Sequence, residues 1–497
     1  MIRYKSNRQI PLEGFHLPFG GQLNPENRWI KWCRVIPWDE LAVGYYKAMD
    51  NDRGRPCKDA RLIIGAVIVK HKLTLSDEET VLQIQENPYL QYFVGFSGYK
   101  DEQPFAPSLF VEIRKRMGVE MFSSFEGVIL EKIGLAKGTT GTGSASHRGK
   151  LLLDATVAEQ SVRYPTDISL LNEARQISEG LIDELYQLSD LSRKPRTYRR
   201  KARRQYLLIT KKRRVSIKER RRGIREQLQY LRRNLKHIAT LLDDIGSTPF
   251  PLRAGRQRQY WIIQHVYSQQ DGMYQDKRRR CDDRIVSISQ PHVRPIVRGK
   301  VSKPTEFGAK LSVSMIEGIA LVDRISWSAF NESQDLKGQI ESYKRRSGFY
   351  PESVLADGIY GNRENRRYMK ERGIRFGGKT LGRPPKQTEE NRDQFKQEQR
   401  QRRLDALERI PIEGKFGQGK NGYRLNYIRA RLQKTSESWI NSIFLVMNLM
   451  VLLRELYEDL LVLAPNCCFL LFQTISTRID LLLGNIFMIP KKELVPS

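Results

Sequence analysis

Apolar residues between Trp38 and Phe96 recur at spacings of three and four, which is the period of amphipathic helices. Three acidic residues follow Ser76, as in a helix that begins with a serine cap and an acidic first turn. Basic side chains are frequent in the same region. We therefore expect a helical N-terminal domain over residues 1–137, either a helix-turn-helix-like DNA reader or a plain packing or dimerisation module.

The segment 138–149 is rich in glycine, serine and threonine, which predicts a linker. The apolar run that follows from Lys150 predicts a buried strand that ends near Asp154. The linker contains no GxxxxGK[ST] sequence and precedes a strand instead of following one, so we do not expect a nucleotide-binding loop. A second domain, residues 150–460, is expected to begin at this strand.

From Ser169 to Leu242 the pattern is helical and strongly basic, which predicts a long helical hairpin within an insertion of about residues 169–275. A solvated helix face is one interpretation of the positive clusters. Few acids balance them, so contact with phosphates is favoured. The basic residues expected to bind DNA here are Arg199, Arg200, Lys201, Arg203, Arg204, Lys211, Lys212, Arg213, Arg214, Arg220, Arg221 and Arg222.

The pattern then changes to short apolar runs separated by helical segments. Strands are predicted at 285–289, 309–314, 319–322, 353–356 and 374–376, with helices at 336–345 and 362–372. The strand at 353–356 ends in Asp357, and a polar stretch over 383–403 leads to Glu413. This order predicts an α/β fold with one mixed sheet.

The apolar run from Ile440 to Leu453 is shorter than a bilayer span and contains polar residues, so a buried helix is expected. The first ten residues lack the apolar centre of a signal peptide, and export is not expected. No role is assigned to the tail, residues 461–497.

The amino-acid composition indicates the kind of partner that the protein binds. Lys and Arg number 86 against 56 Asp and Glu, a net charge of +30, which favours nucleic acid over a membrane surface as the partner. The five cysteines show no CxxC spacing, so neither a disulfide framework nor a zinc site is indicated. A reducing cytoplasm is the expected location.

Three carboxylates are candidates for a metal site, and each alone is more often a cap or turn residue. Asp154 and Asp357 follow predicted strands, and Glu413 comes from a later segment. They meet only if the two strands are neighbours and the later segment packs across their ends. Hard oxygen ligands of this kind suit Mg²⁺, with Mn²⁺ as an alternative, and two ions about 3.5–4 Å apart would clamp a phosphoryl displacement.

Several segments carry a family resemblance, in order from about Ile36 to Leu453. They are Asp154-Ala155-Thr156 with Tyr164-Pro165-Thr166-Asp167, Ala356-Asp357-Gly358-Ile359-Tyr360-Gly361, and Arg409-xxx-Glu413-xxxxxx-Lys420, together with Glu86-Asn87-Pro88-Tyr89-Leu90-Gln91-Tyr92-Phe93 near the N-terminus. The chain resembles bacterial insertion-sequence DDE transposases with an InsH-type N-terminal domain. The resemblance implies an RNase H-like mixed sheet flanked by helices, with an all-α N-terminal domain and a long basic helical insertion.

By the same resemblance, Asp154, Asp357 and Glu413 match the metal-binding catalytic triad. Arg409 and Lys420 match the basic residues that flank the Glu in the Y-R-E-K signature and are expected to bind DNA. Ala406 stands where the signature has Tyr, so that role is lost or moved to a neighbour such as Tyr423. Pro411 precedes Glu413, so the helix is expected to begin near it and to leave Arg409 in an approach loop.

A basic ledge beside the site is also expected, and we assign Arg298, Lys300 and Lys303 to DNA binding. None of the six histidines forms a metal pair in the sequence, so no catalytic histidine is assigned. Trp261 and Trp327 are interpreted either as base-stacking residues or as core residues, with core packing the more common role.

The function implied is a homodimeric transposase that binds the terminal inverted repeats of its element and performs metal-dependent cleavage and strand transfer of double-stranded DNA. It would act in the bacterial cytoplasm near the nucleoid, without a membrane. Two alternatives stay open: a decayed or domesticated DNA-binding protein, and an RNase H-like nuclease without strand transfer.

Overall fold

The structure is a computed structural model. It describes residues 15–17, 21–49, 56–135, 147–246, 249–297, 304–379, 381–382, 389 and 391–456. Most of the predicted linker at 138–149 and all of the tail at 461–497 lie outside the described residues, as do Arg298, Lys300 and Lys303.

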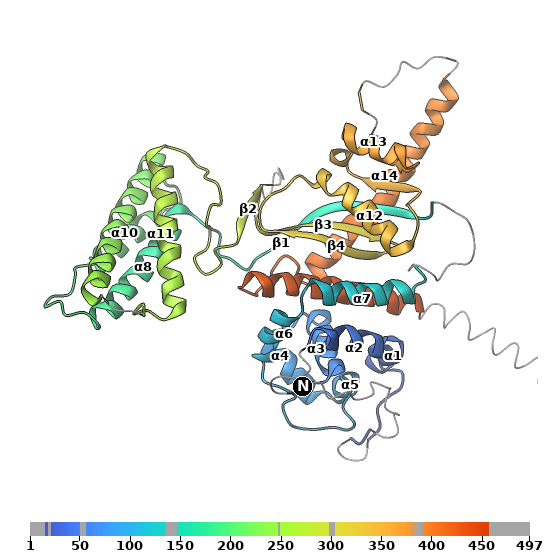
Figure 1. The fold of residues 1–497 in the computed structure, drawn as a ribbon, viewed down its shortest axis with the longest axis horizontal. Coiled ribbons are helices and arrows are strands. Elements are labelled where there is room, and N and C mark those ends of the chain that lie inside the picture. Colours follow the sequence, from blue (N-terminus) through green and yellow to red (C-terminus); the bar gives the residue numbers. More distant parts are fainter. Residues whose placement is uncertain are drawn as a thin grey trace, which may run out of the picture.

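Short helices form the N-terminal part of the chain (Figure 1). They are α1 (Arg28–Val35), α2 (Trp38–Lys47), α3 (Ala60–Lys72), α4 (Asp77–Glu86), α5 (Pro88–Phe93), α6 (Leu109–Arg116) and α7 (Val119–Lys132). The Ser76 hydroxyl accepts a hydrogen bond from the Glu79 amide at 3.0 Å, so the predicted start of α4 is confirmed.

One mixed sheet occupies the centre of the molecule. Its strands are β1 (Lys150–Glu159), β2 (Arg294–Val297), β3 (Thr305–Ile316), β4 (Ile319–Ser326), β5 (Ser353–Ala356) and β6 (Arg375–Phe376). β1 pairs antiparallel with β3 and parallel with β5, β5 pairs parallel with β6, and both β2 and β4 pair with β3. The predicted fold class, an RNase H-like mixed sheet flanked by helices, is confirmed.

The strand predicted at 285–289 is wrong, because no strand forms there. Ile285 and Ile288 belong to the hydrophobic core of the helical insertion, and the Ile285 amide donates to the Gln269 side chain at 3.0 Å instead of to a neighbouring strand. An apolar run predicts that a segment is buried, but it does not predict whether the segment joins a sheet or packs against helices. The chain enters the sheet only at β2, a short edge strand that the pattern did not predict.

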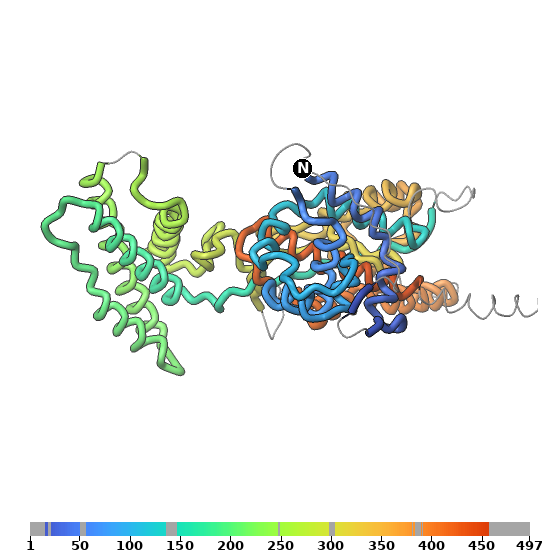
Figure 2. Tube along the Cα trace, turned by 90° about the horizontal axis from the view of Figure 1, so that it is seen from below, coloured from blue at the N-terminus to red at the C-terminus, as the bar shows by residue number. Residues whose placement is uncertain are grey.

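The insertion is a bundle of four helices, so the predicted helical hairpin is wrong. The helices are α8 (Asp167–Tyr186), α9 (Arg199–Thr210), α10 (Ile217–Ile245) and α11 (Ala254–Gln275). Ser216 caps α10 at its start, and Gly246 ends it with a φ of +54°, a conformation that favours glycine. The bundle stands apart from the sheet in both views (Figures 1 and 2) and has its own hydrophobic core.

The remaining helices follow β4. They are the 3-10 helices η3 (Glu332–Gln334) and η4 (Gly358–Tyr360) and the α-helices α12 (Leu336–Ser347), α13 (Arg363–Glu371) and α14 (Arg392–Gly422). α14 begins inside the predicted polar stretch and continues through Pro411, so the prediction that a helix begins near Pro411 is wrong. Proline lacks one backbone donor, but the hydrogen bonds on either side keep the long helix continuous.

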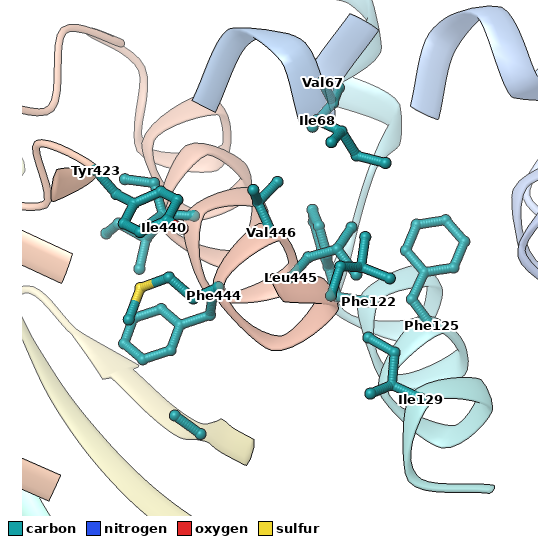
Figure 3. Close-up of a cluster of buried hydrophobic side chains, with 14 of the residues drawn as sticks. Val67, Ile68, Phe122, Phe125, Ile129, Tyr423, Ile440, Phe444, Leu445 and Val446 are labelled. Atoms are coloured by element: carbon teal, nitrogen blue, oxygen red, sulfur yellow. The ribbon is translucent and has the colours of Figure 1, made fainter. Parts of the chain in front are cut away.

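A last helix, Gln433–Leu456, is buried as predicted, and it joins two parts of the protein. By length and composition it would be able to cross a membrane, but 67% of its most apolar window is buried within the protein. Figure 3 shows Leu445 and Val446 on this helix near Phe122 of α7 and Ile68 of α3. The Asn448 side chain bonds both backbone groups of Ala320 in β4, at 3.0 and 2.8 Å. The N-terminal helices and the sheet therefore share one hydrophobic core.

Candidate active site

Asp154 lies inside β1, which continues to Glu159, so the prediction that this strand ends near Asp154 is wrong; Asp357 directly follows the parallel neighbouring strand β5. The β1–β5 ladder pairs Leu153 with Ala356, and the two aspartates are the next residues along. Parallel strands lie about 4.8 Å apart, so the two backbones bring Asp154 and Asp357 to adjoining positions at the C-terminal end of β5. The convergence depends on β1 and β5 being neighbours, although about 200 residues separate them in the chain.

The surroundings of Asp154 include charged residues from α14. Burial raises the pKa of Asp154, while a hydrogen bond from the Ala155 amide at 2.8 Å opposes the rise. The Arg409 guanidinium also lowers the pKa, and the Glu413 carboxylate raises it. Both residues of α14 therefore lie within electrostatic reach of the first aspartate.

Asp357 is exposed and begins the 3-10 helix η4. Its carboxylate accepts a hydrogen bond from the Gly358 amide at 2.6 Å, which is an ordinary capping contact. Asp357 therefore caps a helix, which is the structural role that an acid at this position can have without binding a metal. A carboxylate with a second oxygen and solvent access can still take another ligand.

Glu413 and Arg409 form an ion pair one helical turn apart. The Arg409 guanidinium lies 2.9 Å from the Glu413 carboxylate, and the two side chains are 29% and 53% exposed. The expectation that Arg409 lies in an approach loop is wrong, because α14 is helical on both sides of Pro411. Residues four apart share a helix face, so both side chains point the same way.

Two ion pairs attach α14 to the sheet before Glu413. Arg375 of β6 makes a bidentate pair with the buried Asp405, at 2.6 and 2.9 Å. Lys150, at the start of β1, lies 2.6 Å from Glu408. None of these four residues was predicted from the sequence. The only signal was the spacing of Asp405, Arg409 and Glu413, which repeats every four residues.

Two lysines attach α14 to the sheet after Glu413. The Lys415 ammonium donates to the Gly318 carbonyl at 2.9 Å, and burial lowers the pKa of Lys415 to about 8. Lys420 lies 3.7 Å from the carboxylate of Glu306, a buried residue of β3. The assignment of Lys420 to DNA binding stays a prediction. A DNA phosphate would have to compete with Glu306 of β3 for the Lys420 ammonium.

Tyr423 does not take the place of the missing signature tyrosine at the site. It is buried in the core beside Ile440, as Figure 3 shows. A tyrosine that the sequence analysis left without a role, Tyr360, lies nearer. Burial raises its pKa, with further increases from Glu332 and Asp154, so this buried ring borders the first aspartate.

The donor set at this edge fits a hard divalent cation in its chemistry. All three candidate ligands are carboxylates, and two of them come from adjoining strand positions. Within the part of the chain that the structure describes, no group of three or more Asp, Glu, His or Cys side chains is close enough to hold a metal ion. Glu413 is paired with Arg409 instead. Asp154 and Asp357 therefore stay predicted ligands in adjoining backbone positions at the end of β5.

The basic residues predicted to bind DNA lie on α9, on α10 and in the turn between them. Three of them are paired with acids: Arg199 with Asp183, Lys212 with Glu219, and Arg222 with Glu226. Arg221 stacks over the Tyr274 ring at 4.4 Å. The others are exposed and make no ion pair with described residues; they are Arg200, Lys201, Arg203, Arg204, Lys211, Arg213, Arg214 and Arg220.

The two tryptophans differ in their surroundings. Trp327 is buried, donates to the Glu437 carboxylate at 2.8 Å and packs against His292 with the ring centroids 4.3 Å apart. Trp327 therefore has the core role. Trp261 is 52% exposed on α11. Among the described residues no histidine belongs to a group that could hold a metal, and the pKa of His292 is lowered to about 4 by burial.

Comparisons with known proteins point to one class. A family model described as Transposase DDE domain matches residues 354–450, which include Asp357 and Glu413, and a second described as Transposase domain (DUF772) matches residues 18–116. The uncharacterized protein ORF8 in nfe locus of Rhizobium meliloti is 34% identical over 158 residues, which cover 31% of this chain and 72% of that protein. No solved structure matches. The chain belongs to the insertion-sequence DDE transposases.

Proposed function

We propose that this transposase binds the terminal inverted repeats of its element, cuts the DNA at their ends and joins the freed ends to a target. Asp154, Asp357 and Glu413 would hold Mg²⁺ or Mn²⁺, in a pair of ions. The bound metal supplies an activated water and stabilises charge on the phosphate that is attacked. The enzyme would act as a homodimer on DNA, in the cytoplasm and near the nucleoid.

The observation that carries the proposal is that Asp154, inside β1, adjoins the end of the parallel strand β5, which Asp357 directly follows, with α14 packed against both strands. Arg409 lowers the pKa of Asp154, and Glu413 raises it, so α14 brings both a cation and an acid within electrostatic reach of the first aspartate. A guanidinium at this place also suits a DNA phosphate, which it contacts in a bidentate way.

The residues of the chain divide the remaining work. The exposed basic side chains of α9 and α10 supply a positive surface that binds the DNA backbone without reading its sequence. Arg375 and Lys150 hold α14 against the sheet, which keeps Glu413 within electrostatic reach of Asp154. The partly buried position of Asp154 excludes much of the water that would weaken its interactions.

The test uses Asp357→Asn in the full chain, with Asp393→Asn as the matched control. Asp393 is an exposed acid in the first turn of α14. Asp357→Asn should keep DNA binding and lose Mg²⁺-dependent cleavage by about a hundredfold or more, because an amide is a poor magnesium ligand. The control should cleave like the original chain. Unchanged cleavage by Asp357→Asn would contradict the site.

A strand-transfer assay on a plasmid target separates the remaining alternatives. Joined products support the transposase reading. Cuts without joined products would indicate a nuclease, and DNA binding without cuts would indicate a decayed protein. Ala406 stands in place of the signature tyrosine, and this is the observation that favours testing for a catalytically decayed protein.

A further inference from the structure

Two adjoining open cavities lie where the helical bundle meets the sheet. Their volumes are about 400 and 530 Å³, and they share Tyr164, Pro165 and Arg284. We call them together the junction groove. Figure 1 shows this junction between the bundle and β2. Volumes in this range are typical of sites for a small molecule or a single nucleotide.

Arginines dominate the charge of the junction groove. Arg279 and Arg280 line the first cavity and Arg163 lines the second, and all three are exposed and make no ion pair with described residues. Among the described residues that line the two cavities, Asp167 is the one acid, and Arg284 pairs with it. The groove therefore presents uncompensated positive charge to an anionic ligand.

Tyr164 offers an aromatic face to the same groove. Its side chain is 70% exposed. The ring meets Phe307 of β3 edge to face, with centroids 5.5 Å apart and an interplanar angle of 89°. This contact holds the tyrosine in place while much of its surface stays in solvent. An anchored, exposed aromatic ring among arginines is the combination that binds single-stranded nucleic acid, because every base has a face to stack on.

The groove is separate from the candidate active site. The Gln160 amide donates to the Phe307 carbonyl at 2.9 Å, so the groove begins where β1 leaves the sheet. Gln160 follows Asp154 by about six residues, which is about 20 Å along a strand. That length equals about six base pairs of duplex DNA.

We infer that the junction groove binds an unpaired stretch of DNA several nucleotides from the bond that is cut, with a base stacked on Tyr164 and phosphates on Arg163, Arg279 and Arg280. The inference rests on the proposed function for its ligand. It goes further in assigning a single-strand site to residues outside the triad and outside the basic faces of α9 and α10. A duplex covers the faces of its bases, so duplex DNA would use the arginines but not the tyrosine.

The experiment measures binding of the full chain to fluorescent oligo-dT of about 15 nucleotides and to a duplex of the same length, without divalent metal so that no cleavage occurs. Tyr164→Ala should weaken single-strand binding about tenfold, the loss of one stacked base, and change duplex binding by less than about twofold. Tyr164→Phe should bind like the original chain, because it keeps the ring. A 2-aminopurine within the strand should be quenched by the original chain and not by Tyr164→Ala.

Trp261→Ala is the matched control, since Trp261 is another exposed aromatic residue, on α11 and outside the groove. Equal weakening of single-strand and duplex binding by Tyr164→Ala would overturn the inference, as would an unchanged single-strand affinity. Weakening by Trp261→Ala with Tyr164→Ala unaffected would place the stacking on the bundle. Asp357→Asn should bind oligo-dT normally, so a failure of the cleavage proposal is distinguishable from a failure here.

Discussion

At the scale of single residues, Arg409 interacts with two candidate metal ligands. It pairs with Glu413 at 2.9 Å and lowers the pKa of Asp154. A partly exposed pair of this kind contributes at most about 1 kcal/mol to folding. Its position among the carboxylates therefore matters more for the charge of the site than for the stability of α14.

Replacing Arg409 should separate these two roles. Arg409→Ala should change the free energy of unfolding by less than about 1 kcal/mol, yet slow cleavage by about tenfold to a hundredfold because a phosphate contact is lost. Thermal melting and single-turnover cleavage measure the two effects. Arg402→Ala is the control, because Arg402 forms a similar pair with Glu398 on the same helix, at 3.2 Å. If the two variants cleave alike, Arg409 has no role at the site.

The sequence predicted the candidate site residues from their type and spacing. It did not predict their burial or their ion-pair partners. The pair Arg409–Glu413 has helical spacing, and Pro411 between them led to the wrong prediction of a loop. Proline disfavours a helix interior by a few kcal/mol, which tertiary contacts outweigh here. The ion pairs of Asp405 and Glu408 that hold α14 join residues far apart in sequence, so no local pattern announces them.

At the scale of elements, a group of partly buried charges connects α7 to the sheet. Arg346 of α12 lies 3.4 Å from Glu126 of α7 and 4.0 Å from Asp323 of β4. Burial raises the pKa of Glu126 to about 7, which Arg346 opposes and Asp323 reinforces. Burial also raises the pKa of Asp323. A hydrogen bond that the Gln339 side-chain amide donates to its carboxylate at 2.9 Å opposes this rise. One arginine thus faces two partly buried acids at this interface.

The raised pKa of Glu126 predicts a pH-dependent stability. Between the ordinary pKa and the raised one, the folded chain binds a proton that the unfolded chain releases, so stability falls as pH rises through that window. Relative to Glu126→Gln, the original chain should lose up to about 3 kcal/mol between about pH 5 and pH 8. The melting temperatures of both proteins over this range measure the effect.

Glu131→Gln, on the exposed side of the same helix, is the control for this experiment. It should follow the original chain at every pH. A constant difference between the original chain and Glu126→Gln across the range would mean that Glu126 keeps an ordinary pKa.

At the scale of the whole molecule, the hydrophobic cores do not coincide with the predicted division into an N-terminal domain and a catalytic domain. The N-terminal helices and the sheet share one core through the helix Gln433–Leu456, whereas the helical bundle has a core of its own. The bundle leaves and rejoins the sheet region at nearby points, since Ser161 and Gln290 line the same cavity. An inserted unit whose ends meet in this way is tolerated as an addition to a fold.

Two fragments test this division. Residues 163–290 alone should unfold cooperatively and show helical circular dichroism, because the core of the bundle is complete within them. A chain lacking residues 1–135 should be insoluble or molten, because it exposes the face of the last helix that Phe122 and Phe125 cover (Figure 3). A soluble, cooperatively melting product of the second truncation would show that the sheet does not need the N-terminal helices.

The sequence by itself determined the class of fold and the positions of most strands, because the hydrophobic period is a local pattern. The tertiary structure alone decided that β1 and β5 are neighbours, that the insertion has four helices, and that Ile285 and Ile288 serve the bundle and not the sheet. Burial energy depends on which surfaces meet, and that choice is made between segments far apart in the chain. The junction groove and its Tyr164 are a result of that choice.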